Sequence, residues 1–438
     1  MSPLFAGQGR RRLTRRRFFA GAASLAAGGA AVGAGLDQAQ GGTKQPARET
    51  HKPPGRGDKQ PVIPRVALGR QPSGLPLRQH AWGATLAQDS DGDSIPPRFD
   101  RLLFFDVIGR PTTAHARLLE AALRTLERRY HWGPPGLLFT AGWGHGYFER
   151  LQVPSPIPRA KGMSDFELPS IDDYDLCLHL AGNDSERLAA VEAALLHGEP
   201  LPGAHGPLQI SSALRWRETR TGFVGDGLPA QHQDTGGIPA GQPVSPSAPL
   251  FMGFRSNLRK NQASEDAVTV PDGPFAGATT MQVSYMRLRL ESWYRDLDEN
   301  GRIARMYAPQ VTPEQVSHFT TDAESDPNLL GQAISRYGVV GHAQASARAR
   351  RHGKPLILRR DFSTVDGGQA GLHFVSLQRT IEDFVKTRNA MNASSAQLQN
   401  PAITDTVNNG INSFIFVLKR ANYILPRRSE RSFPLLRS

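Results

Sequence analysis

Hydrophobic residues gather into short continuous runs and helix-like repeats from residue 101 onwards. The apolar run at residues 102–108 is typical of a buried strand, and residues 113–130 repeat apolar side chains at helical spacing. Three further strands and one helix are predicted downstream, at residues 136–140, 174–180 and 208–216 and at residues 185–195. In chain order the elements are strand, helix, strand, strand, helix, strand, which is the order of a ferredoxin-like unit.

The same order returns in the second half of the chain, after a loop rich in glycine and proline at residues 225–249. It begins with a predicted strand at residues 279–288, and one of its helices is capped by Thr312. The other elements are strands at 355–358, 372–377 and 411–418 and helices at 291–298 and 380–391. We therefore predict an α+β fold in which two ferredoxin-like halves, residues 97–235 and 250–430, pack through antiparallel sheets as a dimeric α+β barrel.

The N-terminal region lacks this periodicity. Residues 1–40 hold six arginines, including the run 15–17, and an uncharged stretch of mainly alanine and glycine follows at residues 20–35. This pattern predicts a twin-arginine signal peptide, and the stretch is too short and too weakly hydrophobic to span a membrane. We expect export to the periplasm or the extracellular space, with no stable membrane insertion after cleavage. Residues 41–96, rich in proline and glycine, predict a flexible leader.

The basic charge of the chain is concentrated in this N-terminal region. The formal net charge is +12, and the six arginines and one aspartate of residues 1–40 account for +5 of it. The other residues carry the rest without any dense basic stretch interleaved with aromatic residues. We therefore expect no nucleic-acid partner.

The single cysteine, Cys177, restricts the metal chemistry that the chain can perform. An intrachain disulfide and a cysteine-based zinc or iron–sulfur site are excluded, because each needs at least two thiolates. A bound metal would therefore need histidine or carboxylate ligands. His342 is the candidate, and Arg359 and Arg360 end an apolar strand that could face it across a cavity. Taken alone, such a histidine is more often a structural residue.

Five sequence blocks resemble, in their order and spacing, those of the dye-decolorising (DyP-type) haem peroxidases. The blocks are residues 253–257, 277–280 running into 287–293, 341–344, 358–362 and 371–378. In the family they read Gly-Phe-x-Asp-Gly, Gly-Gly-Thr-Tyr with Arg-x-x-x-Glu-x-Trp, His-x-Arg, Leu-Arg-Arg-Gly-Tyr and Gly-Leu-x-Phe-x-x-x-Gln. Residues 103–106 and 175–178 are similar to strands of the family's first half, so the resemblance covers residues 98–426.

This resemblance implies a haem b cofactor in the C-terminal half and an enzyme that uses hydrogen peroxide to oxidise an organic reductant. By position, His342 would be the proximal ligand that donates an imidazole nitrogen to the iron. Arg359 would be the distal arginine, whose positive charge polarises the O–O bond of peroxide. Arg287 and Phe374 occupy positions that would contact the cofactor, Arg287 near a propionate.

Several positions depart from the family pattern where the chemistry would take place. Ser256 stands at the position of the family's distal aspartate and cannot carry a negative charge at pH 7. General acid–base catalysis of this kind contributes about 10²–10⁴ in rate, so peroxidase activity is expected to be weakened. Glu265 or Asp266 in the following loop could replace the acid. On the proximal side Gln344 stands in place of an arginine, and Asp383 could replace a missing acid.

Three interpretations follow from these residues. The first is an exported haem-binding DyP-type peroxidase, weakened by the loss of the distal acid. The second is a non-enzymatic module that handles haem or iron on the same fold. The third is a secreted structural protein that uses only the scaffold. The sequence leaves homo-oligomerisation open.

Overall fold

The computed structural model describes residues 74–316 and 327–436, all of which belong to the unit Pro61–Ser438. The expected signal peptide, residues 1–40, lies outside the described residues, and so does the first part of the expected leader. No helix in the described ranges has both the length and the hydrophobicity needed to cross a membrane.

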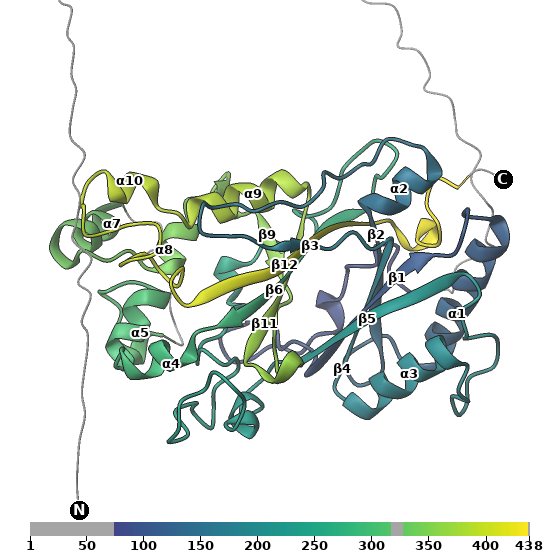
Figure 1. The fold of residues 1–438 in the computed structure, drawn as a ribbon, viewed down its shortest axis with the longest axis horizontal. Coiled ribbons are helices and arrows are strands. Elements are labelled where there is room, and N and C mark those ends of the chain that lie inside the picture. The colour runs from purple at the N-terminus through teal and green to yellow at the C-terminus, as the bar shows by residue number, and fades with distance from the viewer. Residues whose placement is uncertain (1–73, 317–326, 437–438) are drawn as a thin grey trace, which may run out of the picture. The chain divides into compact units, whose positions relative to one another are not determined.

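The N-terminal half is a ferredoxin-like unit, as the sequence predicts (Figure 1). Its elements are β1 (Phe99–Val107), α1 (Thr113–Arg129), β2 (Leu138–Gly144), α2 (His145–Leu151), β3 (Ser170–Ile171), β4 (Leu176–Gly182), α3 (Ser185–His197) and β5 (Leu214–Phe223). The four main strands pair antiparallel in the order β5-β1-β4-β2. The side chain of Thr112 caps α1 and that of Asp184 caps α3, each by accepting a backbone N–H bond in the first turn.

The C-terminal half repeats this strand order with longer insertions. Its main elements are β6 (Thr279–Leu288), α4 (Leu290–Arg295), α5 (Glu299–Met306), β9 (Ile357–Arg359), β10 (Phe362–Thr364), β11 (Gly371–Gln378), α9 (Ile381–Ala390) and β12 (Ile415–Leu425). The insertions contain α7 (Pro327–Gln332), α8 (His342–Ser346), β7 (Arg350–Arg351), β8 (Lys354–Pro355) and α10 (Ser394–Gln397). Four strands lie in the order β12-β6-β11-β9, which matches the N-terminal half. Thr312 caps one short 3-10 turn at Pro313–Gln315.

The two halves close into one antiparallel barrel, which confirms the predicted fold class. At one junction β2 pairs with β12, and at the other the short strand β10 pairs with both β5 and β11. Gly222 lies at the second junction, where a Cβ atom would come within 2.2 Å of the Ser363 carbonyl oxygen. Only glycine lets β5 and β10 approach so closely.

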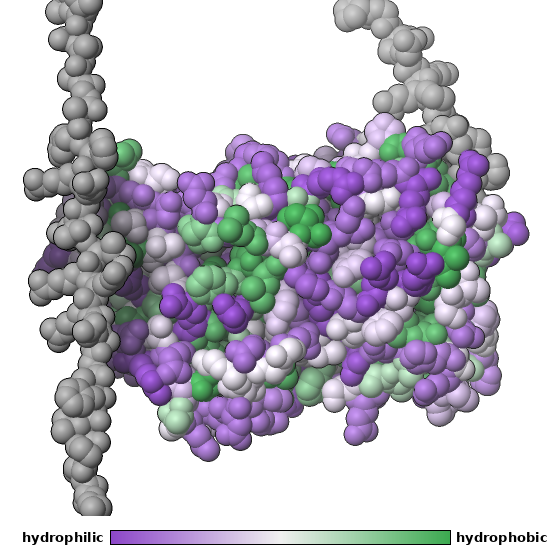
Figure 2. Space-filling model, viewed as in Figure 1, coloured by the Kyte–Doolittle hydropathy of each residue, from purple (hydrophilic) through white to green (hydrophobic). Residues whose placement is uncertain are grey.

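Alternate residues of β1 show how the barrel is packed on both faces. Leu103 and Phe105 belong to the core that includes α1 and α3, whereas Leu102 and Phe104 belong to a second cluster with Val283 of β6. This alternation follows from the two-residue period of a strand. On the face drawn in Figure 2, hydrophilic residues predominate and hydrophobic residues form smaller patches between them.

Of the strands that begin later than the sequence pattern predicts, β5 and β12 differ the most. β5 begins at Leu214, because Ala213 and Leu214 donate backbone hydrogen bonds to the Ile210 carbonyl and form a turn before the strand. β12 begins at Ile415, after a turn in which Phe414 donates to the Ile411 carbonyl. Both turns bury apolar side chains, so the hydrophobic run extends beyond the strand itself.

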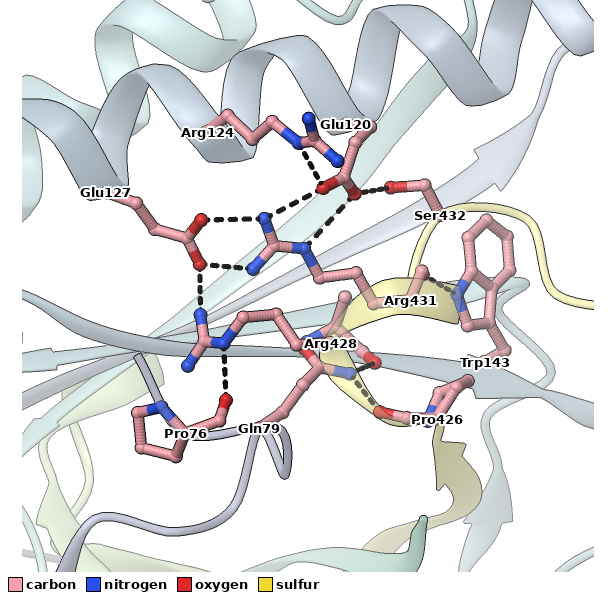
Figure 3. Close-up of polar contacts among 11 residues, drawn as sticks. Pro76, Gln79, Glu120, Arg124, Glu127, Trp143, Pro426, Arg428, Arg431 and Ser432 are labelled. Atoms are coloured by element: carbon pink, nitrogen blue, oxygen red, sulfur yellow. Dashed lines mark hydrogen bonds and ion pairs between the residues drawn. The ribbon is translucent and has the colours of Figure 1, made fainter. Parts of the chain in front are cut away.

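Residues 74–96 are packed against the barrel, which differs from the flexible leader expected as far as residue 96. Trp82 is buried, and the Gln79 amide bonds to both the N–H and the carbonyl of Ala141 in β2, at 2.8 and 3.1 Å. The same amide donates to the Pro426 carbonyl at 2.7 Å, as Figure 3 shows. This segment therefore belongs to the folded unit.

A cluster of buried charges fixes the C-terminal segment beneath α1 (Figure 3). Arg431 donates to both Glu120 and Glu127 of α1, and Arg428 also donates to Glu127. Arg124 and Ser432 add bonds to Glu120 at 2.8 and 2.7 Å. Every guanidinium in this C-terminal ion cluster therefore faces at least one carboxylate.

Candidate functional site

A cavity of about 130 Å³ in the C-terminal half contains most of the residues that the sequence singles out. His342, Arg359, Ser256 and Phe374 all line it. His342 lies in α8 and Arg359 lies at the end of β9. Ser256 lies in the loop before β6, and Phe374 lies in β11, so four separate parts of the chain contribute to the cavity. Most of the remaining wall is apolar.

Methionine side chains contribute to this wall. Met252, Met286, Met306 and Met391 line the cavity, and the whole chain contains only seven methionines. The cavity is smaller than the roughly 300–1,000 Å³ typical of ligand pockets. Methionine has an unbranched, flexible side chain that fills irregular gaps and repacks readily. These four side chains are therefore of a type that can adjust to a ligand.

The backbone around His342 is held in place by close contacts that exclude side chains. Gly341 precedes α8, and a Cβ atom there would lie 1.7 Å from the Tyr307 carbonyl oxygen. Gly410 has a φ of +49°, and a Cβ atom there would lie 2.9 Å from the His342 Cα. Burial, together with the charges of Arg359 and Arg388, lowers the pKa of His342 to about 3. The imidazole is therefore neutral at pH 7, the state that binds metals.

Arg359 is fixed by its backbone while part of its guanidinium stays unpaired. The Gln262 side chain accepts a 2.8 Å hydrogen bond from the Arg359 N–H, and Arg359 Nη2 donates to the Ser256 carbonyl. Arg359 Nε is buried without a hydrogen-bond partner. No ion pair joins Arg359 to a carboxylate of the described residues. Its positive charge is therefore available to a ligand in the cavity.

Asp361 also lines the cavity, although the sequence analysis did not select it. It stands between β9 and β10, two residues after Arg359, and its neighbour Arg360 lies over the Trp82 ring at 3.7 Å. Asp361 is 7% exposed, and its Oδ1 has no hydrogen-bond partner. The two-residue period of an extended chain predicts that Asp361 faces the same cavity as Arg359, because residues i and i+2 share a face.

Arg287, which the sequence places near a propionate, lies outside the cavity. Met286 and Leu288 of β6 line the cavity, so the residue between them points to the opposite face of the strand. Arg287 is exposed there, with its guanidinium 5.6 Å from the Phe416 ring. It is therefore not positioned to contact a cofactor in the cavity.

The acids expected to compensate for the missing ones are also engaged elsewhere. Glu265 accepts the backbone N–H groups of Trp82 and Gly83 at 2.7 and 2.8 Å. Asp266 is exposed and pairs with Arg78. Asp383 of α9 pairs with Arg351 at 2.6 Å. None of the three acids lines the cavity.

Gln344, which stands in place of a proximal arginine, has a local structural role. Its Oε1 accepts the backbone N–H of Gly341 at 3.1 Å, and its side chain is buried. This contact closes the first turn of α8. Gln344 therefore helps to fix the helix that carries His342.

A larger and more polar groove of about 1,060 Å³ adjoins the cavity. Ser256, Arg359 and Asp361 belong to the walls of both. The other residues that line the groove include several arginines and lysines. These three side chains therefore stand between the apolar cavity and an accessible groove.

The donor set of the cavity fits a haem. Within the described ranges no group of three or more histidine, cysteine or acidic side chains is placed to hold a metal ion. A haem requires only one axial histidine, because the porphyrin supplies the other ligands of the iron. Arg388 and Arg420 also line the cavity and pair with Glu167, and Arg420 Nη2 is buried without a hydrogen-bond partner. A propionate is an acceptor that suits such a group.

A family model described as "Family of unknown function (DUF7405)" matches residues 97–427. No curated protein matches the chain. The dye-decolorizing protein from V. cholerae is 15% identical with a TM-score of 0.52, covering 80% of this chain and 98% of its own. The DyP-type peroxidase from Cellulomonas bogoriensis is 18% identical with a TM-score of 0.52, covering 77% and 94%.

A DypB variant from Rhodococcus jostii, in complex with heme, is 13% identical with a TM-score of 0.51, covering 81% of this chain and 99% of its own. At these identities the likeness establishes the fold, which is that of the DyP-type α+β proteins. The functional argument therefore depends on the chain's own residues.

Proposed function

The chain belongs to the DUF7405 family, and from its DyP-type fold we propose that it is an exported haem-binding protein that uses hydrogen peroxide to oxidise organic molecules. The observation that carries this proposal is the cavity that brings His342, Arg359 and Phe374 together from distant parts of the sequence. A secreted protein that used only the scaffold would have no need of a neutral histidine and an unpaired arginine on one apolar cavity.

Each residue has a defined part in this proposal. A bound haem b supplies a redox-active iron, which is the chemistry that amino-acid side chains lack. His342, held neutral by burial, would hold the iron through an imidazole nitrogen. Phe374 and the methionines would pack against the porphyrin. Arg359 would orient peroxide and stabilise negative charge that develops on its oxygen atoms.

The test is a titration of the purified, haem-free protein with haemin, followed by its absorption spectrum. We expect stoichiometric binding and the Soret band of a histidine-ligated ferric haem. His342→Ala should abolish this band, whereas Arg287→Ala, on the opposite face of β6, should bind haemin like the native protein. If the native protein binds no haem, the proposal is wrong. If His342→Ala keeps the native spectrum, His342 is not the ligand.

A non-enzymatic haem-handling role is the second candidate, and Ser256 is the residue that favours it. A serine at the family's acid position removes one established source of proton transfer. The two functions differ in turnover. Oxidation of a dye or of guaiacol by the haem-loaded protein and peroxide supports the peroxidase, whereas haem binding without turnover supports the handling role.

Export is part of the proposal and depends on residues 1–40 alone. The paired arginines before Phe18 and Phe19 are the feature that the twin-arginine pathway recognises. We expect Arg16→Lys combined with Arg17→Lys to leave the protein in the cytoplasm. Cell fractionation followed by immunoblotting measures this, and unchanged export would contradict it.

A further inference from the structure

We propose that Asp361 is the proton-transferring acid of this site and replaces the acid that is missing at position 256. The inference rests on the proposed haem site and adds a catalytic residue to it. Two departures from the DyP pattern are then explained together, as the move of one aspartate from the first block to the second. The block at residues 253–257 has lost its aspartate, and the block at residues 358–362 has gained one where the family has glycine.

The backbone directs Asp361 to the side of Arg359. Residues 359–361 connect β9 to β10 in an extended path, and the Arg360 N–H bonds to the Val375 carbonyl at 2.7 Å. Arg360 lies on the other side, where it donates to the His80 carbonyl. Arg359 and Asp361 therefore face the cavity together, as residues two apart on extended chain do.

The Ser256 side chain hydrogen-bonds to the Asp361 carboxyl, but no cation of the described residues forms an ion pair with it. The Oδ1 atom of this carboxyl is enclosed without a hydrogen-bond partner. Buried carboxylates that serve the fold usually have a cationic partner, because an unpaired charge is costly to bury. A buried carboxyl without an ion-pair partner on the wall of a cavity is therefore a candidate for catalysis.

The neighbouring groups suit a carboxyl that gains and loses a proton. Burial raises the pKa of Asp361, and the charge of Asp100 on β1 acts in the same direction. The positive charge of Arg359 and hydrogen bonding from the Ser256 side chain act against that rise. Ser256 thus becomes the partner of the acid instead of the acid itself.

The chemical step that we assign to Asp361 is a proton relay. The carboxylate accepts the proton from one oxygen of a bound peroxide and returns the same proton to the other oxygen. The O–H bond broken on the first oxygen is matched by one formed on the second. The carboxyl ends the relay in its starting charge state, so this step needs no further oxidant or reductant.

Cyanide binding to the haem-loaded protein tests the relay without relying on turnover. Hydrogen cyanide must lose its proton to bind as an anion, so a nearby base accelerates its association. We expect Asp361→Asn to bind haemin as tightly as the native protein but to slow cyanide association at pH 7 by about 10²-fold or more. Asp266→Asn removes an exposed acid from the adjoining groove and should leave the rate unchanged.

The exchange of positions provides a second, stricter test. Ser256→Asp introduced together with Asp361→Asn returns the acid to the family's position and should restore most of the association rate. This double variant also keeps the test informative if Asp361→Asn alone folds poorly. An unchanged rate in haem-loaded Asp361→Asn would overturn the inference while leaving the haem site intact. A native protein that binds no haem would overturn both.

Discussion

Two sets of buried charged side chains in this protein use the same residue types but differ in how completely they are paired. In the C-terminal ion cluster, Arg428 and Arg431 share the carboxylates of Glu120 and Glu127. On the cavity wall, Arg359 and Asp361 lie two residues apart and form no ion pair. Burial of charge thus serves the fold in one region, and in the other it leaves groups free for a ligand.

Removing one carboxylate from the ion cluster should have the largest effect on stability. Glu127 has a fully buried side chain and contacts two guanidinium groups. Glu127→Gln leaves both cations without this counter-charge, so we expect a loss of about 3–5 kcal/mol in the free energy of unfolding. Urea denaturation followed by circular dichroism measures this loss.

The matched control for this substitution is an exposed ion pair. Glu149 pairs with Arg159 at 2.6 Å, and about half of each side chain is exposed. Glu149→Gln should change the free energy of unfolding by less than about 0.5 kcal/mol. A similar loss in both variants would show that pairing in the buried cluster is not what stabilises the C-terminal segment.

The two regions should respond to acid over different pH ranges. His342 has a pKa of about 3 in the folded, haem-free protein, against 6.5 when unfolded, so it removes stability as the pH falls below 6.5. Burial alone would raise the pKa of Glu120, but Arg431, Arg124 and Ser432 lower it overall. The contribution of Glu120 to the free energy of unfolding is therefore complete above pH 4.5 and is lost only below that value.

Substitutions should separate these two contributions. His342→Ala should reduce the loss of unfolding free energy between pH 7 and pH 5 by up to about 2 kcal/mol. Glu120→Gln should leave that interval unchanged and flatten the profile below pH 4.5. Denaturation curves at pH 7, 5 and 3.5 measure both effects, and identical profiles for the two variants would contradict the assignment.

Removing the unpaired arginine should have the smallest effect on stability. Arg359→Met breaks one bond to the Ser256 carbonyl but also removes a half-buried charge that has no carboxylate partner. We expect the haem-free protein to gain up to about 1 kcal/mol. Thermal unfolding checks the sign. A loss as large as that of Glu127→Gln would mean that Arg359 is a structural residue.

The sequence predicted the order of elements well, because buried strands and amphipathic helices leave strong periodic patterns. It did not predict closure of the barrel through β10, because three residues, Phe362–Thr364, are too few to show a period. The starts of β5 and β12 were placed too early, since Ile210 and Ile411 continue the apolar run inside turns.

The residues that the sequence motifs single out differ in where the structure places their side chains. His342, Arg359, Ser256 and Phe374 reach one cavity. Arg287 does not, although its motif matches, because its neighbours in β6 take the inward positions. Asp361 was overlooked because the family has glycine there. Strand alternation, applied to each motif, predicts the directions of both Arg287 and Asp361.

The close approach of β5 and β10 at Gly222 has a consequence for solubility as well as for shape. A side chain at this position would collide with the Ser363 carbonyl and the Phe362 ring, and the seam would part. Both strands would then present unpaired backbone groups to other molecules, which is how sheets recruit partners into aggregates. One missing methyl group thus keeps the barrel from offering a free edge.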